Sequence, residues 1–516
     1  MPGKRLGIKE KAPEYLLIIL SGVLINLPLS YPQFYYTGWI ALLPFLMSCK
    51  LSTDKSVNSS GDAVSPFEGF KKGWLLGIVI FMMVSFWLYF PLVNFSGLPW
   101  IISIFLLAML FLVAGLFYGL WAWLFLLPGR KKGFSSLWLA ISWTGIEYLR
   151  YRLLPDLPFA FAGYTQVDFL QLLQLADIGG VFFLSFIVIL FNGYLFKLFR
   201  QRRLRHLIPF GLILIIIFTF GSLKLNYYQD KEYKYLRTGI VQTSISASEK
   251  WKVANIEPIL NLLLKKSSQF KEADLIVWPE SSLTFDLIRN EYYRKKFIEG
   301  LAGIKAYIQA GSLAIIDDEY QRYNSSFLIA PGGRIKGRYN KLRLVPFGEY
   351  LPFAEVIKSF SGYSMNSSNP GQEVVIFTIP SARWKTAICS EILYPELVQR
   401  KVEQADFIVN QSNEAWYLHG NLQEQMWIAA VFRAVENRRS IVKAGNFAFS
   451  GLISPSGRAI IKNAPGQGGL ISGSVNFNRE ETFYQQWGDF AGYLSLGIIL
   501  LLLLIKLIMK LRVRAR

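Results

Sequence analysis

Long uncharged apolar runs near both ends of the chain constrain its fold more than any other feature. They fill most of the sequence before about residue 228 and return after about residue 488, with a stretch of ordinary mixed composition between them. A helix needs about 20 mostly apolar residues to cross a bilayer, so these runs predict membrane-spanning helices. Hydrophobic residues make up 52% of the sequence and charged residues only 17%, which is unusual for a soluble protein.

The apolar runs supply eight candidate spans, of which the second and the fifth are short or interrupted. We expect an N-terminal transmembrane domain of about seven helices at 1–227, an extracytoplasmic domain at 228–488, and a C-terminal transmembrane helix with a basic cytoplasmic tail at 489–516. The eight spans cover residues 14–30, 36–49, 73–93, 100–127, 136–150, 181–199, 207–225 and 490–509.

Lysine and arginine recur in every second loop between these expected spans. Basic loops precede the first span, follow the second, fourth and sixth, and close the chain, whereas the loops at Pro32 and at Asn94–Pro99 carry no basic residue. Because basic residues of short loops stay in the cytoplasm, we expect both termini there and residues 228–488 outside it. In a bacterial cell this domain would be periplasmic, at the inner membrane.

The basic excess and the few metal-ligating residues exclude two classes of function. The formal net charge is +20, but the basic residues lie mostly beside apolar runs, so we expect no nucleic-acid partner. The chain has two cysteines, Cys49 and Cys389, and two histidines, His206 and His419. A site built from such ligands needs three or four that converge, so we expect no metal.

Between the last two spans, short β-branched runs alternate with amphipathic helical patterns, which predicts an α/β layered domain. The expected strands are 238–243, 275–278, 307–316, 326–330, 374–379, 384–388, 407–410, 440–444 and 470–475, and the expected helices are 256–270, 291–305, 394–404 and 421–438.

Cys389 follows the strand-like run 384–388 and precedes a predicted helix. A thiol at such a turn is expected to be exposed and close to backbone N–H groups, and both conditions favour thiolate. An arbitrary cysteine is more often a small buried hydrophobe. The expected topology, however, separates Cys389 from the cytoplasmic end of the second span, where Cys49 lies, so the two cannot pair. Cys389 is therefore a lone extracytoplasmic thiol and a candidate nucleophile.

Carboxylates and a lysine are the candidate partners of this thiol. His206 lies in a cytoplasmic loop, which leaves only His419, so the base is expected to be a carboxylate. Glu280 lies at the end of the run 275–279, where α/β sites gather. Lys341 could stabilise the oxyanion that forms when a thiolate attacks an ester. Glu349 could stabilise either the Lys341 ammonium or the general base. A solvated glutamate and a surface lysine are the alternatives.

Three motifs together resemble the nitrilase superfamily, whose Glu, Lys and Cys triad follows this order. They are Trp278-Pro279-Glu280, the run from Lys341 to Phe353, and Ile388-Cys389-Ser390-Glu391. Over essentially its whole length the chain resembles the membrane-embedded bacterial branch, the apolipoprotein N-acyltransferases. Supporting matches are Val241-Gln242 followed by Trp251, Ser412-Asn413-Glu414-Ala415-Trp416, the run from Arg433 to Arg438, and Gly163-Tyr164-Thr165-Gln166.

The resemblance implies an αββα sandwich and a two-step acyl transfer without a cofactor. An acyl chain would pass from a phospholipid, expected to be phosphatidylethanolamine, to Cys389 as a thioester, and then to the α-amino group of a diacylglyceryl-cysteine on an apolipoprotein. Glu280 would be the general base and Lys341 the oxyanion stabiliser. The supporting or pocket residues would be Glu349, Trp251, Glu391, Ser390 and Trp416.

The sequence departs from the family pattern close to these motifs. Ser390 stands where tyrosine is usual and Arg343 where histidine is frequent, while Glu414 and Tyr417 replace Asp and Phe. The segment from Lys443 to Ala448 also differs from a common Arg-Ala-Thr-Asn-Asn-Gly pattern.

Two other functions are compatible with the same residues. A membrane-tethered nitrilase-type amidase or thioester hydrolase would use the triad with water as acceptor. A transporter or lipid-binding scaffold would not use the triad for chemistry. Its spans would be expected to carry clustered charges, and we expect no such clusters in these spans.

Overall fold

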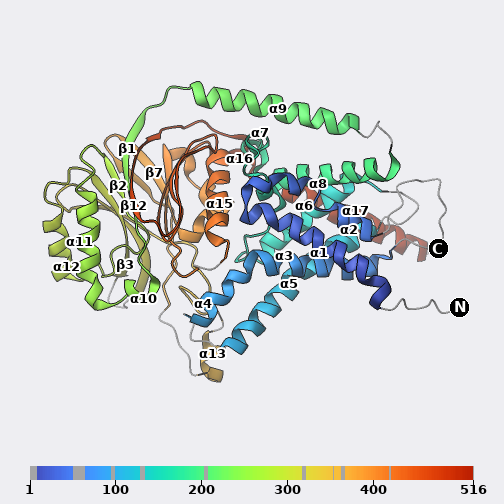
Figure 1. Ribbon diagram of the computed structural model, residues 1–516, viewed down its shortest axis with the longest axis horizontal. Helices are drawn as coiled ribbons and strands as arrows, with labels where there is room; N and C mark the ends of the chain where they lie inside the picture. The colour runs from blue at the N-terminus through green and yellow to red at the C-terminus, as the bar shows by residue number, and fades with distance from the viewer. Residues whose placement is uncertain are drawn as a thin grey trace. The chain divides into compact units, whose positions relative to one another are not determined.

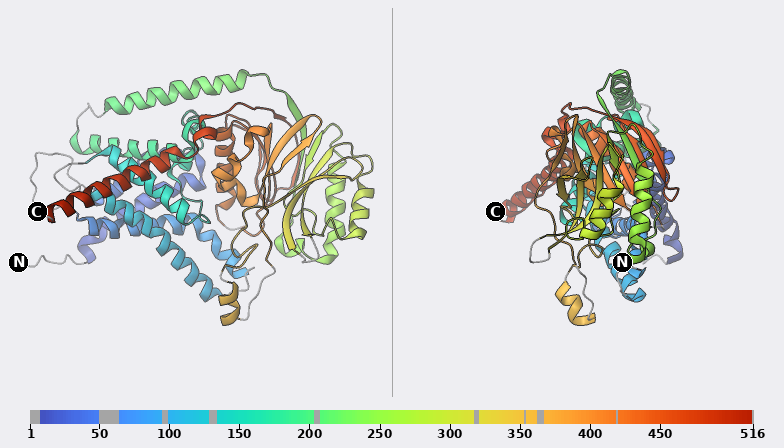
Figure 2. Two further views of the ribbon diagram at one scale, coloured as in Figure 1. Left: turned by 180° about the vertical axis from the view of Figure 1, so that it is seen from behind. Right: turned by 90° about the vertical axis from the view of Figure 1, so that its left-hand side faces the viewer.

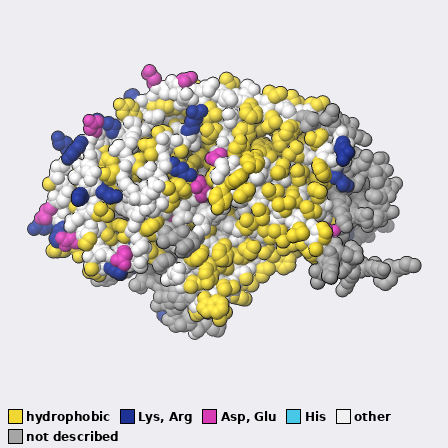
Figure 3. Space-filling model, in the orientation of Figure 1, with side chains coloured by type: hydrophobic (Ala, Val, Ile, Leu, Met, Phe, Trp, Pro, Cys, Tyr) yellow, Lys and Arg dark blue, Asp and Glu magenta, His cyan; other side chains and the backbone are white. Residues whose placement is uncertain are grey.

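A computed structural model of the protein describes residues 8–49, 64–94, 99–127, 134–202, 207–316, 321–352, 354–361, 367–417 and 420–514. The chain divides into two compact units: Met1–Phe86 with Ile104–Leu225 and Gln486–Arg516, and Trp87–Ser103 with Asn226–Gln485. The first unit is helical, and the second contains the described strands. On the face drawn in Figure 3, hydrophobic side chains cover most of the helical unit, and charged side chains gather over the strand-containing unit.

Six helices of the described residues are long and apolar enough to cross a bilayer, and they match six of the eight expected spans. They cover Ala12–Ser30, Pro66–Asn94, Trp100–Leu126, Ala176–Gln201, Ile208–Asp230 and Phe490–Val513. The elements that form them are α1 (Ile8–Ser30), α3 (Pro66–Ser85) with η2 (Phe86–Leu88) and α4 (Tyr89–Asn94), α5 (Trp100–Leu126), α8 (Ala176–Gln201), α9 (Leu207–Asp230) and α17 (Phe490–Arg514) (Figure 1).

The second and fifth expected spans differ from these six. Residues 36–49 fall into η1 (Pro32–Trp39) and the six-residue α2 (Leu43–Ser48), which extends only about 9 Å at the usual helical rise. Residues 136–150 lie in α6 (Ser136–Leu153), whose 18 residues include Glu147, Arg150 and Arg152. Among the described residues, therefore, length and composition alone identify six of the eight expected spans.

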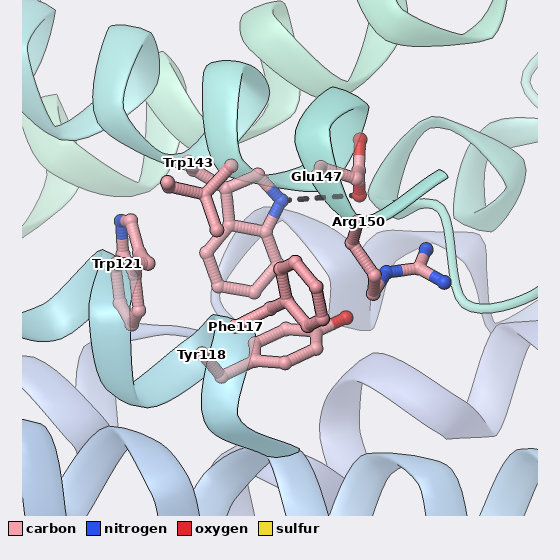
Figure 4. A pocket seen from close by; sticks show the side chains of 7 residues that line it. Phe117, Tyr118, Trp121, Trp143, Glu147 and Arg150 are labelled. Carbon is pink, nitrogen blue, oxygen red and sulfur yellow. Dashed lines mark hydrogen bonds between the residues drawn. The ribbon is translucent and has the colours of Figure 1, made fainter. Parts of the chain in front are cut away.

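Two charged residues of α6 are buried, contrary to the expectation that the spans lack such clusters. Arg150 donates to the carbonyl oxygens of Leu157 at 2.9 Å and Phe159 at 2.7 Å, and Glu147 accepts from the amide of Ala162 at 2.8 Å and from Trp143 Nε1 at 3.2 Å. Beside them lies a cavity of about 10 Å³, which has aromatic walls (Figure 4) and room for about one water molecule. Both charges thus hold the loop that follows α6.

Two six-stranded sheets form the second unit, in the orders β12-β1-β2-β3-β4-β5 and β11-β10-β9-β8-β7-β6. The strands are β1 (Tyr235–Gln242), β2 (Leu275–Val277), β3 (Tyr307–Ile316), β4 (Gln321–Ile329), β5 (Ile335–Asn340), β6 (Ile376–Ile379), β7 (Ala382–Ile388), β8 (Phe407–Asn413), β9 (Ser440–Asn446), β10 (Ser450–Ile453), β11 (Ala459–Asn463) and β12 (Gly469–Asn476).

Helices cover the outer faces of both sheets. On the first sheet, α11 (Ile256–Ser267) and α12 (Glu291–Gly300) bury Leu260, Leu263 and Phe297 against β2 and β3 (Figures 1 and 2). On the second, α15 (Leu422–Asn437) packs against β9 and β10, and α14 (Pro395–Gln399) lies beside α15. This arrangement confirms the expected αββα sandwich. The remaining short elements are α7 (Leu170–Leu173) and η4 (Ala162–Gln166) in the helical unit, and α10 (Ala247–Lys250), η6 (Val253–Asn255), α13 (Ala354–Ser361), η7 (Cys389–Leu393) and η8 (Val402–Gln404) in the strand-containing unit. The division between the units falls within α16 (Phe483–Trp487).

The strand directions bring several carboxyl ends to one edge. β1, β2 and β3 are parallel, and so are β7, β8 and β9. β5 is antiparallel to β4, which is antiparallel to β3, so β5 ends at the same edge as β3. A parallel bridge between Thr243 and Asn446 joins the edges of the two sheets just beyond β1 and at the end of β9. Side chains that follow these strands are therefore placed near one another.

A buried polar network joins the inner faces of the sheets. Gln309 on β3 donates to Ser326 Oγ at 2.9 Å, Thr386 Oγ1 at 2.8 Å and Gln411 Oε1 at 3.2 Å, and its Oε1 accepts from Trp384 Nε1 at 2.7 Å. Ser326 belongs to the first sheet, and the other three belong to the second. Hydrogen bonds between the two sheets therefore stabilise the interior of the sandwich in addition to apolar packing.

Candidate active site

Glu280, Lys341 and Cys389 each follow the carboxyl end of a strand, and all three are buried. Glu280 lies after β2, Lys341 directly after β5 and Cys389 directly after β7. Lys341 Nζ lies 3.4 Å from Glu280 Oε1 and 2.8 Å from Glu349 Oε2. The structure therefore brings the predicted base, cation and supporting carboxylate into one cluster.

The Glu280 carboxylate is held by two donors that the sequence analysis did not assign. Asn324 Nδ2 on β4 donates to Oε1 at 2.7 Å, and the backbone N–H of Asn413 donates to Oε2 at 2.8 Å. Buried Lys250 donates to the backbone oxygen of Glu280 at 3.0 Å. Asn413 stood within a quoted motif, but Asn324 and Lys250 carried no sequence signal. These contacts fix the carboxylate without occupying all of its lone pairs.

Glu349 completes the environment of the Lys341 ammonium. Its Oε1 accepts from Asn324 Nδ2 at 2.6 Å and its Oε2 from the amide of Val345 at 2.9 Å. Burial lowers the pKa of Lys341, but Glu349 and then Glu280 outweigh it and hold that pKa well above its usual value. Lys341 is thus a permanent positive charge at neutral pH, as an oxyanion stabiliser requires.

Cys389 begins η7 and adopts a φ of 52°, a left-handed conformation that is strained for a residue with a Cβ. The side chain is buried, and burial followed by Glu280 raises the pKa of its thiol while Lys341 opposes them. The expectation of an exposed thiol that favours thiolate is therefore wrong. The turn carries only a five-residue 3-10 helix, and desolvation outweighs its few amide dipoles.

Glu391 joins the loops that carry Lys341 and Cys389. Its carboxylate accepts from Tyr339 Oη at 2.9 Å, the amides of Leu342 at 2.7 Å and Arg343 at 3.2 Å, and the amide of Ile388 at 2.7 Å. The side chain is fully buried, and burial raises its pKa although these amides oppose the shift. Glu391 therefore connects the end of β5 to the end of β7.

The remaining predicted pocket residues are less buried than the triad. Ser390 and Trp416 are half-buried, and Trp251 is 38% exposed at the end of α10. Phe353, His206 and His419 lie outside the described residues, as do many of the basic loop positions used for topology.

The cluster has the parts needed for acyl transfer: a thiol, a carboxylate and a fixed cation at one strand edge. Among the described residues there is no group of three or more His, Cys, Asp or Glu that could hold a metal ion. What these parts can do directly is attack a carbonyl carbon, accept a proton and stabilise an oxyanion.

Known proteins resemble both parts of the chain. Residues 21–194 match the model of the apolipoprotein N-acyltransferase N-terminal domain, and residues 237–485 match that of carbon-nitrogen hydrolases. An amidase of the nitrilase superfamily from Nesterenkonia, solved as a cysteine-to-alanine mutant, is 15% identical with a TM-score of 0.39, covering 50% of this chain and 95% of its own.

Two curated relatives extend over nearly the whole sequence. The apolipoprotein N-acyltransferase of Geobacter metallireducens is 31% identical over 92% of this chain and 92% of its own. That of Pseudomonas syringae is 26% identical over 95% and 96%. Together with the matched N-terminal and hydrolase domains, they establish that this chain belongs to the apolipoprotein N-acyltransferase family of membrane acyltransferases.

Proposed function

We propose that this protein moves an acyl chain from a membrane phospholipid to the α-amino group of a diacylglyceryl-cysteine at the N-terminus of an apolipoprotein. Cys389 is the nucleophile, Glu280 the general base and Lys341 the oxyanion stabiliser. The observation that carries the assignment is the buried Lys341 ammonium, which lies within 3.4 Å of Glu280 and 2.8 Å of Glu349 at the edge that also holds Cys389.

In the first step the Cys389 sulfur attacks the ester carbonyl carbon while Glu280 takes the thiol proton. Lys341 stabilises the negative oxygen of the tetrahedral intermediate. The glycerol oxygen then leaves and takes the proton from Glu280, which gives a thioester and a lysophospholipid. Because the raised pKa keeps the thiol protonated at neutral pH, proton transfer to Glu280 has to accompany the attack.

In the second step the neutral α-amino group of the acceptor attacks the thioester carbonyl. Glu280 removes a proton from the attacking nitrogen and returns it to the departing sulfur, so an amide forms and the thiol is restored. Since the donor remnant leaves before the acceptor binds, the kinetics are ping-pong. The phospholipid ester supplies the acyl group already activated, so the scheme needs no cofactor.

Both substrates lie in a bilayer, which suits a catalytic domain carried by membrane helices. The proposed donor is phosphatidylethanolamine and the proposed location the bacterial inner membrane. Residues 1–227 form the N-terminal membrane domain, residues 228–488 the periplasmic catalytic domain, and 489–516 the last helix with its cytoplasmic tail. Five crossings or seven before residue 228 put the catalytic domain on the same side, opposite the N-terminus.

Charge supports the eight-crossing topology. With six crossings, the basic loops after residue 49 and after residue 127 would lie outside the cytoplasm, against the usual distribution of lysine and arginine. The 18 residues of α6 rise about 27 Å, which approaches the thickness of a bilayer core.

The deciding experiment uses the full-length protein in proteoliposomes with acyl-labelled phosphatidylethanolamine and a diacylated lipopeptide. Wild type is expected to form a hydroxylamine-sensitive thioester without acceptor and a triacylated product with it. Cys389→Ala should form neither, while Cys49→Ala, which removes the other buried cysteine, should behave as wild type. Triacylated product from Cys389→Ala would contradict the mechanism, and release of free fatty acid in place of product would identify a hydrolase.

A further inference from the structure

The nucleophile turn is held by a side chain that the proposed mechanism does not use. Asn410 on β8 is fully buried, and its Nδ2 donates to the carbonyl oxygens of Ala387 at 2.9 Å and of Cys389 at 3.3 Å. These two carbonyls flank Ile388, at the point where the chain leaves β7 and enters the left-handed conformation of Cys389. Such a conformation persists only where the surrounding structure holds it.

The orientation of the Asn410 amide is set by an ammonium on its other side. Lys443 Nζ on β9 lies 2.9 Å from Asn410 Oδ1, 3.1 Å from Ser412 Oγ and 3.0 Å from Glu414 Oε1. An ammonium can only donate, so the amide oxygen has to face it and the amide nitrogen is left for the two carbonyls. The strand register agrees, because Asn410 pairs with Ala387 on one side and with Lys443 on the other.

Glu414 in turn balances the charge of Lys443. Both side chains are fully buried, and a buried ammonium without a counter-charge would be strongly destabilised. The backbone N–H of Glu414 donates to the carbonyl of Asn446 at 2.9 Å, which ties this carboxylate to the end of β9. A continuous line of contacts therefore runs from Glu414 through Lys443 and Asn410 to the backbone of the nucleophile.

We propose that Asn410 is a positioning residue for Cys389, and that the buried Lys443–Glu414 ion pair fixes the amide orientation on which this role depends. The inference rests on the proposed role of Cys389 as nucleophile. Asn410 touches no reacting atom: it holds the peptide groups that aim the sulfur. Removal of its donor should therefore slow thioester formation without changing how the phospholipid binds.

The primary test compares acylation kinetics of full-length variants in proteoliposomes containing labelled phosphatidylethanolamine. Asn410→Asp keeps the shape and the Lys443 contact but removes the donor, and should lower the rate of thioester formation at least about tenfold with KM for the phospholipid unchanged. Asn437→Asp is the matched control, because Asn437 is also fully buried and donates to a backbone carbonyl, that of Arg433, within α15. It should acylate at the wild-type rate.

The second test exchanges the ion pair and remains decisive if Asn410→Asp fails to fold. Lys443→Arg lengthens the cation and Glu414→Asp shortens the carboxylate, so each alone should lower the rate, and the double variant should return to within about twofold of wild type. Wild-type acylation by Asn410→Asp, or a double variant no faster than its parents, would overturn the inference while the proposed function stands. Thioester formation by Cys389→Ala would overturn both.

Discussion

Burial of the Cys389 thiol has a consequence for when the sulfur becomes nucleophilic. Burial and the neighbouring Glu280 raise its pKa above the ordinary value of 9.0, and Lys341 only partly opposes them. Below that pKa the group is a thiol, so it gains reactivity only while a base removes its proton. Protection against oxidation follows from the same fact, since the thiolate is the reactive form.

Glu280→Gln should separate thiol ionisation from catalysis. Loss of the neighbouring negative charge lowers the pKa of Cys389, so in a Cys49→Ala background the pH midpoint for alkylation by iodoacetamide should move down. Acyl transfer should nonetheless fall by about two orders of magnitude, because the proton acceptor is gone. Glu272→Gln, at a carboxylate whose side chain is 83% exposed, should change neither. An alkylation midpoint that moves up in Glu280→Gln would contradict this account.

Glu349 should control the upper pH limit of the reaction. Lys341 is charged below its pKa, and Glu349 is the largest of the influences that raise that pKa. In Glu349→Gln the pKa of Lys341 therefore falls, and the alkaline decline of thioester formation should shift to lower pH, with a rate loss of at least about tenfold at pH 8. A pH profile with an unmoved alkaline limb would show that Glu349 acts in another way.

The sequence singles out Glu280, Lys341 and Cys389 as candidates, but it does not reveal the groups that contact them. Glu280, Lys341 and Cys389 stand in recognisable motifs, whereas Asn324 and Lys250 come from a polar strand and a four-residue helix with no pattern of their own. The burial of Cys389 was also missed, because a strand-to-helix turn in sequence does not reveal what covers it. Two departures from the family pattern, Glu414 and Lys443, turn out to be partners in one ion pair.

At the scale of elements, the interior strands were easier to predict than the edge strands. β2, β3 and β8 are largely buried, and each contains a short apolar run: residues 275–277, 313–316 and 407–409. β5 and β11 lie at sheet edges and are largely exposed or half-buried, and their mixed sequences were not predicted as strands. β10 was also missed, because its four residues are too few to show a period.

Gln309 offers a test of how the two sheets are joined. Gln309→Leu removes the acceptor of Trp384 Nε1 and the donor to Gln411 Oε1, and each buried polar group left without its partner costs about 1–3 kcal/mol. We expect a lower midpoint of thermal unfolding in detergent, equivalent to roughly 2–6 kcal/mol. Gln404→Leu, at an exposed glutamine of η8, is the control. An unchanged midpoint in Gln309→Leu would mean that packing alone joins the sheets.

At the scale of the whole molecule, topology can be resolved by single introduced cysteines. In a Cys49→Ala, Cys389→Ala background, exposed Lys271→Cys should react with an impermeant maleimide in intact spheroplasts, and exposed Lys510→Cys only after lysis. Lys71→Cys, at the exposed start of α3, distinguishes the two crossing counts. With eight crossings it reacts only after lysis, whereas labelling in intact cells would mean that residues 36–49 do not cross.

The contacts of Glu391 have a further consequence for genetic screens. The buried Glu391 carboxylate accepts hydrogen bonds from the backbone of both loops. A substitution that displaces one loop is therefore expected to displace the other as well. A mutational screen that measures only lipoprotein maturation would therefore give Glu391 variants the same loss of activity as variants of the proposed triad. An assay of loop conformation, such as proteolytic sensitivity after residue 341, would instead identify Glu391 as a structural residue that holds the two loops together.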